Sequence, residues 1–189
     1  MRVIGLTGIM GAGKSTVIDI LKKHQIPVLD CDKINHQLLK KGEKGYLAIT
    51  QQFGYAFLAK DETIDMKKMS SFMFENTQQK QQVESLLHPL ILSEIKAQIH
   101  SLTTKVVVVE VPLLFEVGWE YVFDEIWVVA CDQEILLQRL QQYRNIMEKE
   151  AKLRISYQLP QQVKIDKADY VLYNNTDKAD LEKQILALL

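Results

Sequence analysis

Eight residues near the amino terminus have the types and the spacing of a phosphate-binding loop. Residues 8–15 read Gly-Ile-Met-Gly-Ala-Gly-Lys-Ser and match the pattern G-x-x-x-x-G-K-[ST]. They lie between an apolar run over 3–7 and a segment of helical spacing over 15–24. Glycines let successive backbone N–H groups converge on phosphate oxygens, and the start of a helix adds the positive end of its dipole. The residues expected to bind phosphate are Gly11, Ala12, Gly13, Lys14, Ser15 and Thr16.

Two side chains of this loop have more specific predicted roles. Lys14 should reach the β- and γ-phosphates of ATP, and the hydroxyl of Ser15 should complete the coordination of Mg²⁺. ATP and Mg²⁺ are therefore the expected cofactors. A plain glycine-rich turn is the alternative, but the flanking strand and helix favour a phosphate loop.

Acidic residues follow or interrupt two other apolar runs. Asp30 and Asp32 come after a predicted strand over 26–29, at the edge where open α/β sheets bind ligands. One of them could accept the proton of an acceptor hydroxyl; helix capping is the alternative, and for Asp30 it is the favoured one. Glu110 interrupts the apolar run 106–111, where a lone carboxylate is costly. We expect Glu110 to have a role at the Mg²⁺ site rather than to be buried there without a function.

Arginines flank a polar segment in the last third of the chain. Arg139, Arg144 and Arg154 fall on predicted helices around residues 143–148, a segment that could close over a nucleotide as a lid. A closing arginine can offset the charge of a transferred phosphoryl group. The alternative is a solvated basic face.

The elements that must position these residues alternate between strand and helix. Strands are expected over 3–7, 26–29, 106–111, 125–130 and 170–173, with helices between them, which predicts a doubly wound α/β fold. No convincing strand lies within 42–104, where helices are expected over 46–53, 66–74 and 78–99. Pro89 predicts a helix boundary or a kink at His88 and Pro89.

Composition bounds the class of protein. A chain of 189 residues with 47% hydrophobic positions fits one compact soluble domain with a helical insertion. A net charge of −1 provides no general positive field, so no nucleic-acid partner is expected. Cys31 and Cys131 are expected to be small buried hydrophobes, and the first apolar run is too short for a signal peptide or a membrane span. These points predict a cytoplasmic protein without a membrane partner.

Among phosphate-loop proteins, a small-molecule kinase fits this length best. A GTPase would need an N-K-x-D segment, and the nearest string, Asn-Asn-Thr-Asp over 174–177, lacks the lysine. A motor ATPase is disfavoured by the small size and single loop. A kinase for another alcohol or for a nucleoside monophosphate stays open, as does a nucleotide-binding regulatory module without transfer activity.

Several longer segments resemble the dephospho-CoA kinase family, in order and spacing, over essentially the whole chain. They are Gly-Leu-Thr-Gly over 5–8, Asp-Cys-Asp over 30–32, Leu-His-Pro-Leu-Ile over 87–91, Val-Pro-Leu-Leu-Phe-Glu over 111–116, and a tail with Gln158, Lys164 and Ala-Asp-Tyr-Val over 168–171. The resemblance implies ATP-dependent phosphorylation of the ribose 3′-hydroxyl of dephospho-CoA, the last step of coenzyme A synthesis. It also implies a three-layer P-loop kinase fold with a five-stranded parallel sheet in the order 2-3-1-4-5.

The resemblance further implies a division of the single kinase domain and a set of site residues. The core would span about 1–35 and 105–189, the CoA-binding helical insertion about 36–104, and the lid about 140–155. Asp32 would be the catalytic aspartate, with Lys14 and Arg139 acting on phosphate. Asn174 would lie near adenine, and Arg144 would bind the nucleotide. The acceptor side would comprise His88, Pro89, Leu113, Phe115 and Glu116, for which structural support of the insertion is the alternative.

Three departures from the family pattern bear on these roles. The loop has Ile9-Met10 where Gly-Ile is common, Glu110 stands where aspartate is more usual, and Arg-Asn-Ile over 144–146 replaces Arg-Asp-Gly. None removes a group that the chemistry needs, but the missing glycine puts the hinge of the lid in doubt. The oligomeric state stays open.

Overall fold

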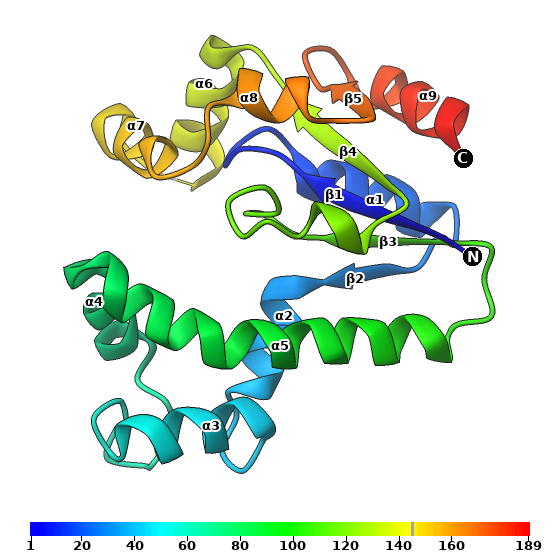
Figure 1. Cartoon of the computed structure of the whole chain (residues 1–189). Coiled ribbons are helices and arrows are strands. Elements are labelled where there is room, and N and C mark those ends of the chain that lie inside the picture. Colours follow the sequence, from blue (N-terminus) through cyan, green and yellow to red (C-terminus); the bar gives the residue numbers. More distant parts are fainter. Residues whose placement is uncertain (145) are drawn as a thin grey trace. The chain divides into compact units, whose positions relative to one another are not determined.

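The computed structural model describes residues 1–144 and 146–189, with the backbone alone for Tyr143 and Arg144. The chain divides into two compact units. The first comprises Met1–Asp30 and Thr104–Leu189, and the second comprises Cys31–Thr103. The first unit contains the sheet and the second contains a group of helices (Figure 1).

The first unit is built around a five-stranded sheet. Its strands are β1 (Arg2–Thr7), β2 (Val28–Asp30), β3 (Val106–Glu110), β4 (Glu125–Ala130) and β5 (Tyr170–Tyr173). They pair in parallel in the order β2-β3-β1-β4-β5, which confirms the predicted order. The middle residues of β3 and nearly all of β4 are buried, as a sheet covered on both faces requires.

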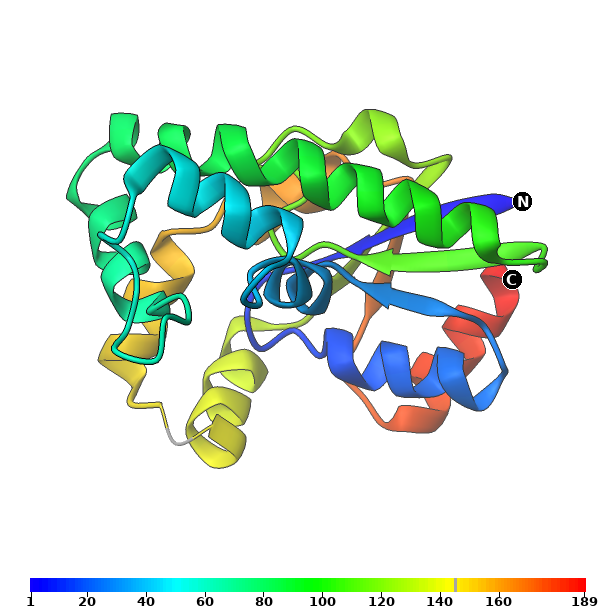
Figure 2. The ribbon, with the colours of Figure 1, turned by 90° about the horizontal axis from the view of Figure 1, so that it is seen from below.

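Helices lie on both faces of this sheet. They are α1 (Lys14–Lys23), α6 (Gln133–Arg144), α7 (Glu148–Ser156), α8 (Gln161–Asp166) and α9 (Lys178–Leu188), with a 3₁₀ turn, η1, at Glu120–Val122. Helices α1 and α9 lie side by side on one face, and α8 packs against β4 on the other (Figure 2). Apolar side chains of α1, β1, β4 and α9 form the core between the first pair of helices and the sheet. Helix α8 and η1 were not predicted from the sequence.

The second unit is helical. Its helices are α2 (Cys31–Leu38), α3 (Lys44–Phe53), α4 (Met66–Glu75) and α5 (Thr77–Ser101). The first three all contact the long helix α5. An aromatic cluster of Phe53, Phe57 and Phe72, with ring centroids 4.9–5.5 Å apart, joins the end of α3 to α4. The helices predicted for this region are therefore confirmed.

The predicted helix boundary at Pro89 is wrong. Helix α5 continues through Pro89 as a single element of 25 residues. Proline lacks the N–H that the carbonyl of Ser85 would otherwise accept, so the helix loses one hydrogen bond at this point. The buried residues Val83, Leu87, Ile91 and Ile95 continue one apolar face across the proline, and their packing supports the helix on both sides of it.

Both cysteines are buried, as expected, and neither forms a disulfide. Burial raises the pKa of the Cys131 thiol above its usual value, so the thiol stays protonated and unreactive at neutral pH. Within the described residues, no helix has the length and hydropathy needed to cross a membrane.

Candidate functional site

The loop between β1 and α1 has a backbone that only glycine tolerates at its last position. Gly13 has a φ of 103° and directly precedes α1. A Cβ atom there would lie 2.0 Å from Nδ2 of Asn174. The first turn of α1 contains no acidic residue, and no side chain caps its N–H groups. The positive end of this helix is therefore suited to an anion such as phosphate.

Lys14 lies against the loop that precedes it. Its Nζ donates a hydrogen bond to the carbonyl oxygen of Gly8 at 2.9 Å and lies 3.5 Å from that of Ile9. Ser15 is exposed, as a hydroxyl that is to meet a metal ion must be. The ammonium group and the helix start belong to the same short segment, so the loop has the parts that phosphate binding needs.

Arg139 and Asn174 meet behind the loop. The buried Asn174 donates from Nδ2 to the carbonyl oxygen of Ala12 at 2.9 Å. Arg139 in turn donates from Nη1 to the backbone oxygen of Asn174 at 2.9 Å. The structure thus brings these two predicted residues together, with Asn174 holding the loop backbone. Their predicted contacts with phosphate and adenine stay predictions.

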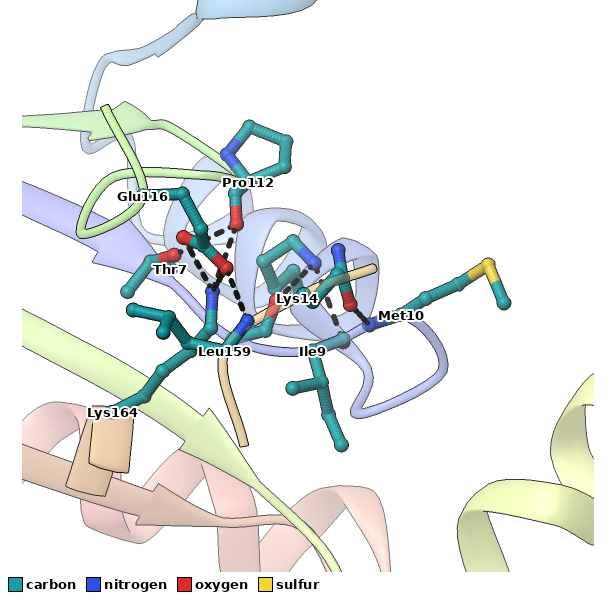
Figure 3. Close-up of polar contacts among 10 residues, drawn as sticks. Thr7, Ile9, Met10, Lys14, Pro112, Glu116, Leu159 and Lys164 are labelled. Carbon is teal, nitrogen blue, oxygen red and sulfur yellow. Dashed lines mark hydrogen bonds and ion pairs between the residues drawn. The ribbon is translucent and has the colours of Figure 1, made fainter. Parts of the chain in front are cut away.

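A buried ion pair lies beside the start of the loop (Figure 3). Nζ of Lys164, whose side chain is 0% exposed, lies 2.7 Å from Oε1 of Glu116. Lys164 also lies 3.4 Å from the carbonyl oxygen of Pro112, which accepts a hydrogen bond from Oγ1 of Thr7 at 3.1 Å. A buried ammonium group is costly unless it is paired, so this pair is part of the structure of the core. Glu116 therefore has a supporting role here, and its role on the acceptor side stays a prediction.

Gln158 contacts the phosphate loop directly. Its Oε1 accepts a hydrogen bond from the backbone N–H of Met10 at 2.9 Å, across 148 positions of the chain (Figure 3). The next residue, Leu159, donates its N–H to Oε1 of Glu116 at 2.9 Å. Sequence reasoning placed Gln158 and Lys164 only in the segment that resembles a family, because nothing local shows what either side chain touches.

Two carboxylates stand at the carboxyl ends of neighbouring strands. Asp30 and Glu110 are paired across β2 and β3, and Glu110 is also level with Leu6 of β1, just before the loop. The hydroxyl of Ser15 and the carboxylate of Glu110 are oxygen donors, the type that Mg²⁺ takes. Mg²⁺ in phosphate sites needs only one or two protein ligands beside water and phosphate oxygens, so these residue types fit it.

A family model described as dephospho-CoA kinase matches residues 2–180. The chain belongs to the dephospho-CoA kinase family. A protein of Lactobacillus johnsonii named dephospho-CoA kinase is 37% identical over 189 residues, which cover 98% of this chain and 96% of that protein. The resemblance found in the sequence is therefore confirmed.

Solved structures agree with this family in fold. The dephospho-CoA kinase of Campylobacter jejuni is 28% identical, with a TM-score of 0.71 over 100% of this chain and 96% of that one. The protein TT1252 from Thermus thermophilus is 29% identical, with a TM-score of 0.88 over 100% and 97% of the two chains. The sheet described above is thus the sheet of a P-loop kinase.

The residues predicted for the acceptor side, and the predicted catalytic residue Asp32, occur in both units. In the first unit, Leu113 is exposed, whereas Phe115 is buried with Nζ of Lys167 5.5 Å from its ring centroid. In the second unit, Asp32 is exposed in the first turn of α2, and Pro89 is exposed on α5. Beside it, burial lowers the pKa of His88, against the opposing charge of Glu84, so the imidazole is neutral at pH 7.

The residues predicted to form the lid are described only in part. Arg144 ends α6, but its side chain lies outside the described residues, as does Asn145 altogether. Arg154, on α7, forms an ion pair with Glu150 one turn earlier, at 2.6 Å. Both side chains are about half exposed, so this ion pair is solvated. The role of Arg154 at the lid stays a prediction.

Proposed function

We propose that this chain transfers the γ-phosphoryl group of ATP to the ribose 3′-hydroxyl of dephospho-CoA, giving coenzyme A and ADP. The observation that carries the proposal is the phosphate loop with Lys14 at the start of α1, in a chain of the dephospho-CoA kinase family. This reaction is the last step of coenzyme A synthesis.

The reaction needs a positioned acceptor and groups that offset negative charge. The 3′-oxygen forms a bond to the γ-phosphorus while the bond to the β–γ bridging oxygen breaks, and ADP leaves. Asp32 takes the proton of the hydroxyl. The N–H groups of residues 11–16 and the ammonium of Lys14 hold the phosphates, and Arg139 offsets the charge that moves between them.

Mg²⁺ is the second expected cofactor. Ser15 and Glu110 would hold it. When bound beside ATP, Mg²⁺ offsets the negative charge of the β- and γ-phosphate oxygens.

The remaining assignments complete the proposal. Asn174 and Arg144 contribute to the nucleotide site, and the acceptor contacts come from His88, Pro89, Leu113, Phe115 and Glu116. The protein acts as a single kinase domain in the cytoplasm, on a small-molecule substrate, without a nucleic-acid or membrane partner. Residues 36–104 bind the CoA part of the acceptor, and residues 140–155 form the lid.

A phosphorylation assay with an acceptor panel tests this function. The chain is incubated with MgATP and dephospho-CoA, adenosine, AMP or pantothenate, and each product is identified by mass. One added phosphate on dephospho-CoA alone is the expected result. Turnover of another acceptor instead would keep the kinase and reject the substrate. ATP binding without any product would favour a regulatory nucleotide-binding module.

A further inference from the structure

We propose that Gln158 is a positioning residue for the phosphate loop, and that the buried Glu116–Lys164 pair holds Gln158 in place. The proposal rests on the proposed function in one respect, namely that the loop of residues 8–13 binds ATP. It adds a contact, from the segment between α7 and α8, that sets the conformation of this loop.

The bond from Met10 to Gln158 sets the orientation of one peptide group. The N–H of Met10 and the carbonyl of Ile9 belong to the same planar peptide and point in opposite directions. On one side, the N–H of Met10 donates to Oε1 of Gln158 at 2.9 Å. On the other side, the carbonyl oxygen of Ile9 accepts from the N–H of Ala12 at 3.2 Å and lies 3.5 Å from Nζ of Lys14.

This orientation matters because the loop works through its backbone. If the peptide between Ile9 and Met10 turned over, its carbonyl would leave Ala12 and Lys14, two residues that are to bind phosphate. A part-buried N–H also costs free energy when it has no acceptor. Gln158 both satisfies the N–H of Met10 and selects one of the two orientations of this peptide.

Backbone hydrogen bonds on both sides hold the main chain at Gln158. Its own N–H donates to the carbonyl of Ile155 at the end of α7, at 2.9 Å, and the next N–H, of Leu159, donates to Glu116. Glu116 is in turn paired with Lys164 on α8. Two backbone bonds on adjacent residues therefore hold the main chain from which Gln158 reaches the loop.

The same ion pair also contacts the residue that precedes the loop. The carbonyl of Pro112 accepts from Oγ1 of Thr7 and lies 3.4 Å from Nζ of Lys164. Thr7 directly precedes Gly8, and Met10 is the third residue of the loop. The cluster of Thr7, Pro112, Glu116 and Lys164 that Figure 3 labels thus contacts the loop at its start. Through Leu159 and its neighbour Gln158, the same cluster is linked to Met10 within the loop.

Replacing Gln158 by methionine tests the proposal, because methionine keeps the length of the side chain and removes the strong acceptor. Binding of ATP and ADP is measured by calorimetry in the absence of any acceptor substrate. We expect Gln158→Met to weaken both affinities about tenfold. In steady-state assays, kcat should fall and the KM for dephospho-CoA should stay unchanged. Wild-type nucleotide affinity and kcat would overturn the proposal.

Gln184→Met is the matched control. Oε1 of Gln184, on α9, also accepts a backbone N–H, that of Tyr173, at 2.9 Å. Gln184→Met removes this bond together with the two that Nε2 of Gln184 donates, to the carbonyl oxygen of Tyr173 and to Oδ2 of Asp180. It should therefore lower the urea midpoint of unfolding at least as much as Gln158→Met does. Only Gln158→Met should change nucleotide affinity. An equal loss of affinity in both variants would show a general structural effect and reject a positioning role.

A double-mutant cycle tests the part played by Glu116. Glu116→Gln keeps an acceptor for Leu159 but removes the charge that pairs with Lys164. If the ion pair acts through Gln158, the single substitution Glu116→Gln should weaken ADP binding. The same substitution made in the Gln158→Met variant should then weaken ADP binding little further. Additive effects would reject this part of the proposal. Because ADP binding needs no acceptor, a wild-type protein that binds ADP but does not phosphorylate dephospho-CoA would reject only the proposed reaction.

Discussion

Asp32 is the residue on which the proposed chemistry depends most. It is exposed in the first turn of α2, two positions after the last residue of β2. Asp32→Asn keeps the size of the side chain but cannot take the proton of the acceptor. We expect kcat to fall by roughly 10² to 10⁴-fold while the affinity for ATP stays nearly unchanged, because a general base contributes that much. Steady-state kinetics and calorimetry measure the two quantities, and an unchanged kcat would reject Asp32 as the base.

Gly13 carries the steric constraint of the loop. Gly13→Ala would place a methyl group 2.0 Å from Nδ2 of Asn174, in a backbone conformation that side chains rarely adopt. Asn174 would have to move and release the carbonyl of Ala12. We expect loss of ATP binding by calorimetry, together with a lower unfolding temperature.

Gly118→Ala separates the collision at Gly13 from backbone strain. Gly118 also has a positive φ, of 69°, but nothing lies within 4 Å of the position of its Cβ. This variant should lose about 1 kcal/mol of stability and retain ATP binding. If Gly13→Ala also retained ATP binding, the contact between residue 13 and Asn174 would not be needed for ATP binding.

At the scale of elements, α5 contains a proline that its packing tolerates. Pro89 is exposed, and the buried residues of α5 lie on both sides of it. Pro89→Ala restores a helical N–H, so we expect the free energy of unfolding to rise by about 1–3 kcal/mol. Urea unfolding monitored by far-UV circular dichroism measures it. The KM for dephospho-CoA in the same variant is a separate readout, and a rise in it would support the predicted acceptor role of Pro89.

The amino terminus of α9 has a side-chain cap that can be tested alone. Oδ1 of Asp177 accepts the N–H of Asp180 at 2.9 Å. Asp177→Ala removes this bond and should lower the free energy of unfolding by about 1 kcal/mol. Asp177→Asn keeps an acceptor oxygen and should lose much less. Equal losses in the two variants in urea unfolding would show that the cap contributes nothing.

At the scale of the first unit as a whole, Glu182 links α9 to the end of α1. Its carboxylate lies 2.8 Å from Nζ of Lys23 and 2.5 Å from Nε2 of His24. The hydrogen bonds from Lys23 and then His24 lower the pKa of Glu182 below its usual value. The folded state therefore binds a proton at Glu182 less readily than the unfolded state does, in which the pKa of a glutamate is about 4.3.

This linkage predicts how stability depends on pH. The contribution of Glu182 is fully present above the unfolded pKa and is lost as pH falls through the lower, folded pKa. Urea midpoints of the wild-type protein and of Glu182→Gln should therefore differ at pH 7 and converge below about pH 4. A difference that stays constant with pH would show that the ion pairs of Glu182 do not contribute.

Much of the molecule could be predicted from the sequence because the signals are local. The phosphate loop is a motif of adjacent residues, and the mainly apolar run over 106–111 predicts a buried parallel strand from its own composition. The helix predicted over 66–74 follows in the same way from its spacing, and the structure has it at Met66–Glu75. Pro89 shows the limit of local reasoning. The sequence around it predicts the loss of a helical hydrogen bond, but not the packing along α5 on both sides of it.

What only the tertiary structure decided is how residues far apart in the chain meet at the loop. Lys164 is an ordinary lysine in a short polar helix until the fold buries it against Glu116, 48 positions away. Asn174, which follows β5, meets Ala12 because parallel strands bring their carboxyl ends to one edge of the sheet. Gln158 meets Met10 because the fold brings the segment between α7 and α8 to the same loop. Sequence by itself determined the phosphate-loop motif of residues 8–15, with its strand before and its helix after. The tertiary fold determined which side chains contact that loop, because hydrogen bonds depend on proximity in space and the sequence records only proximity along the chain.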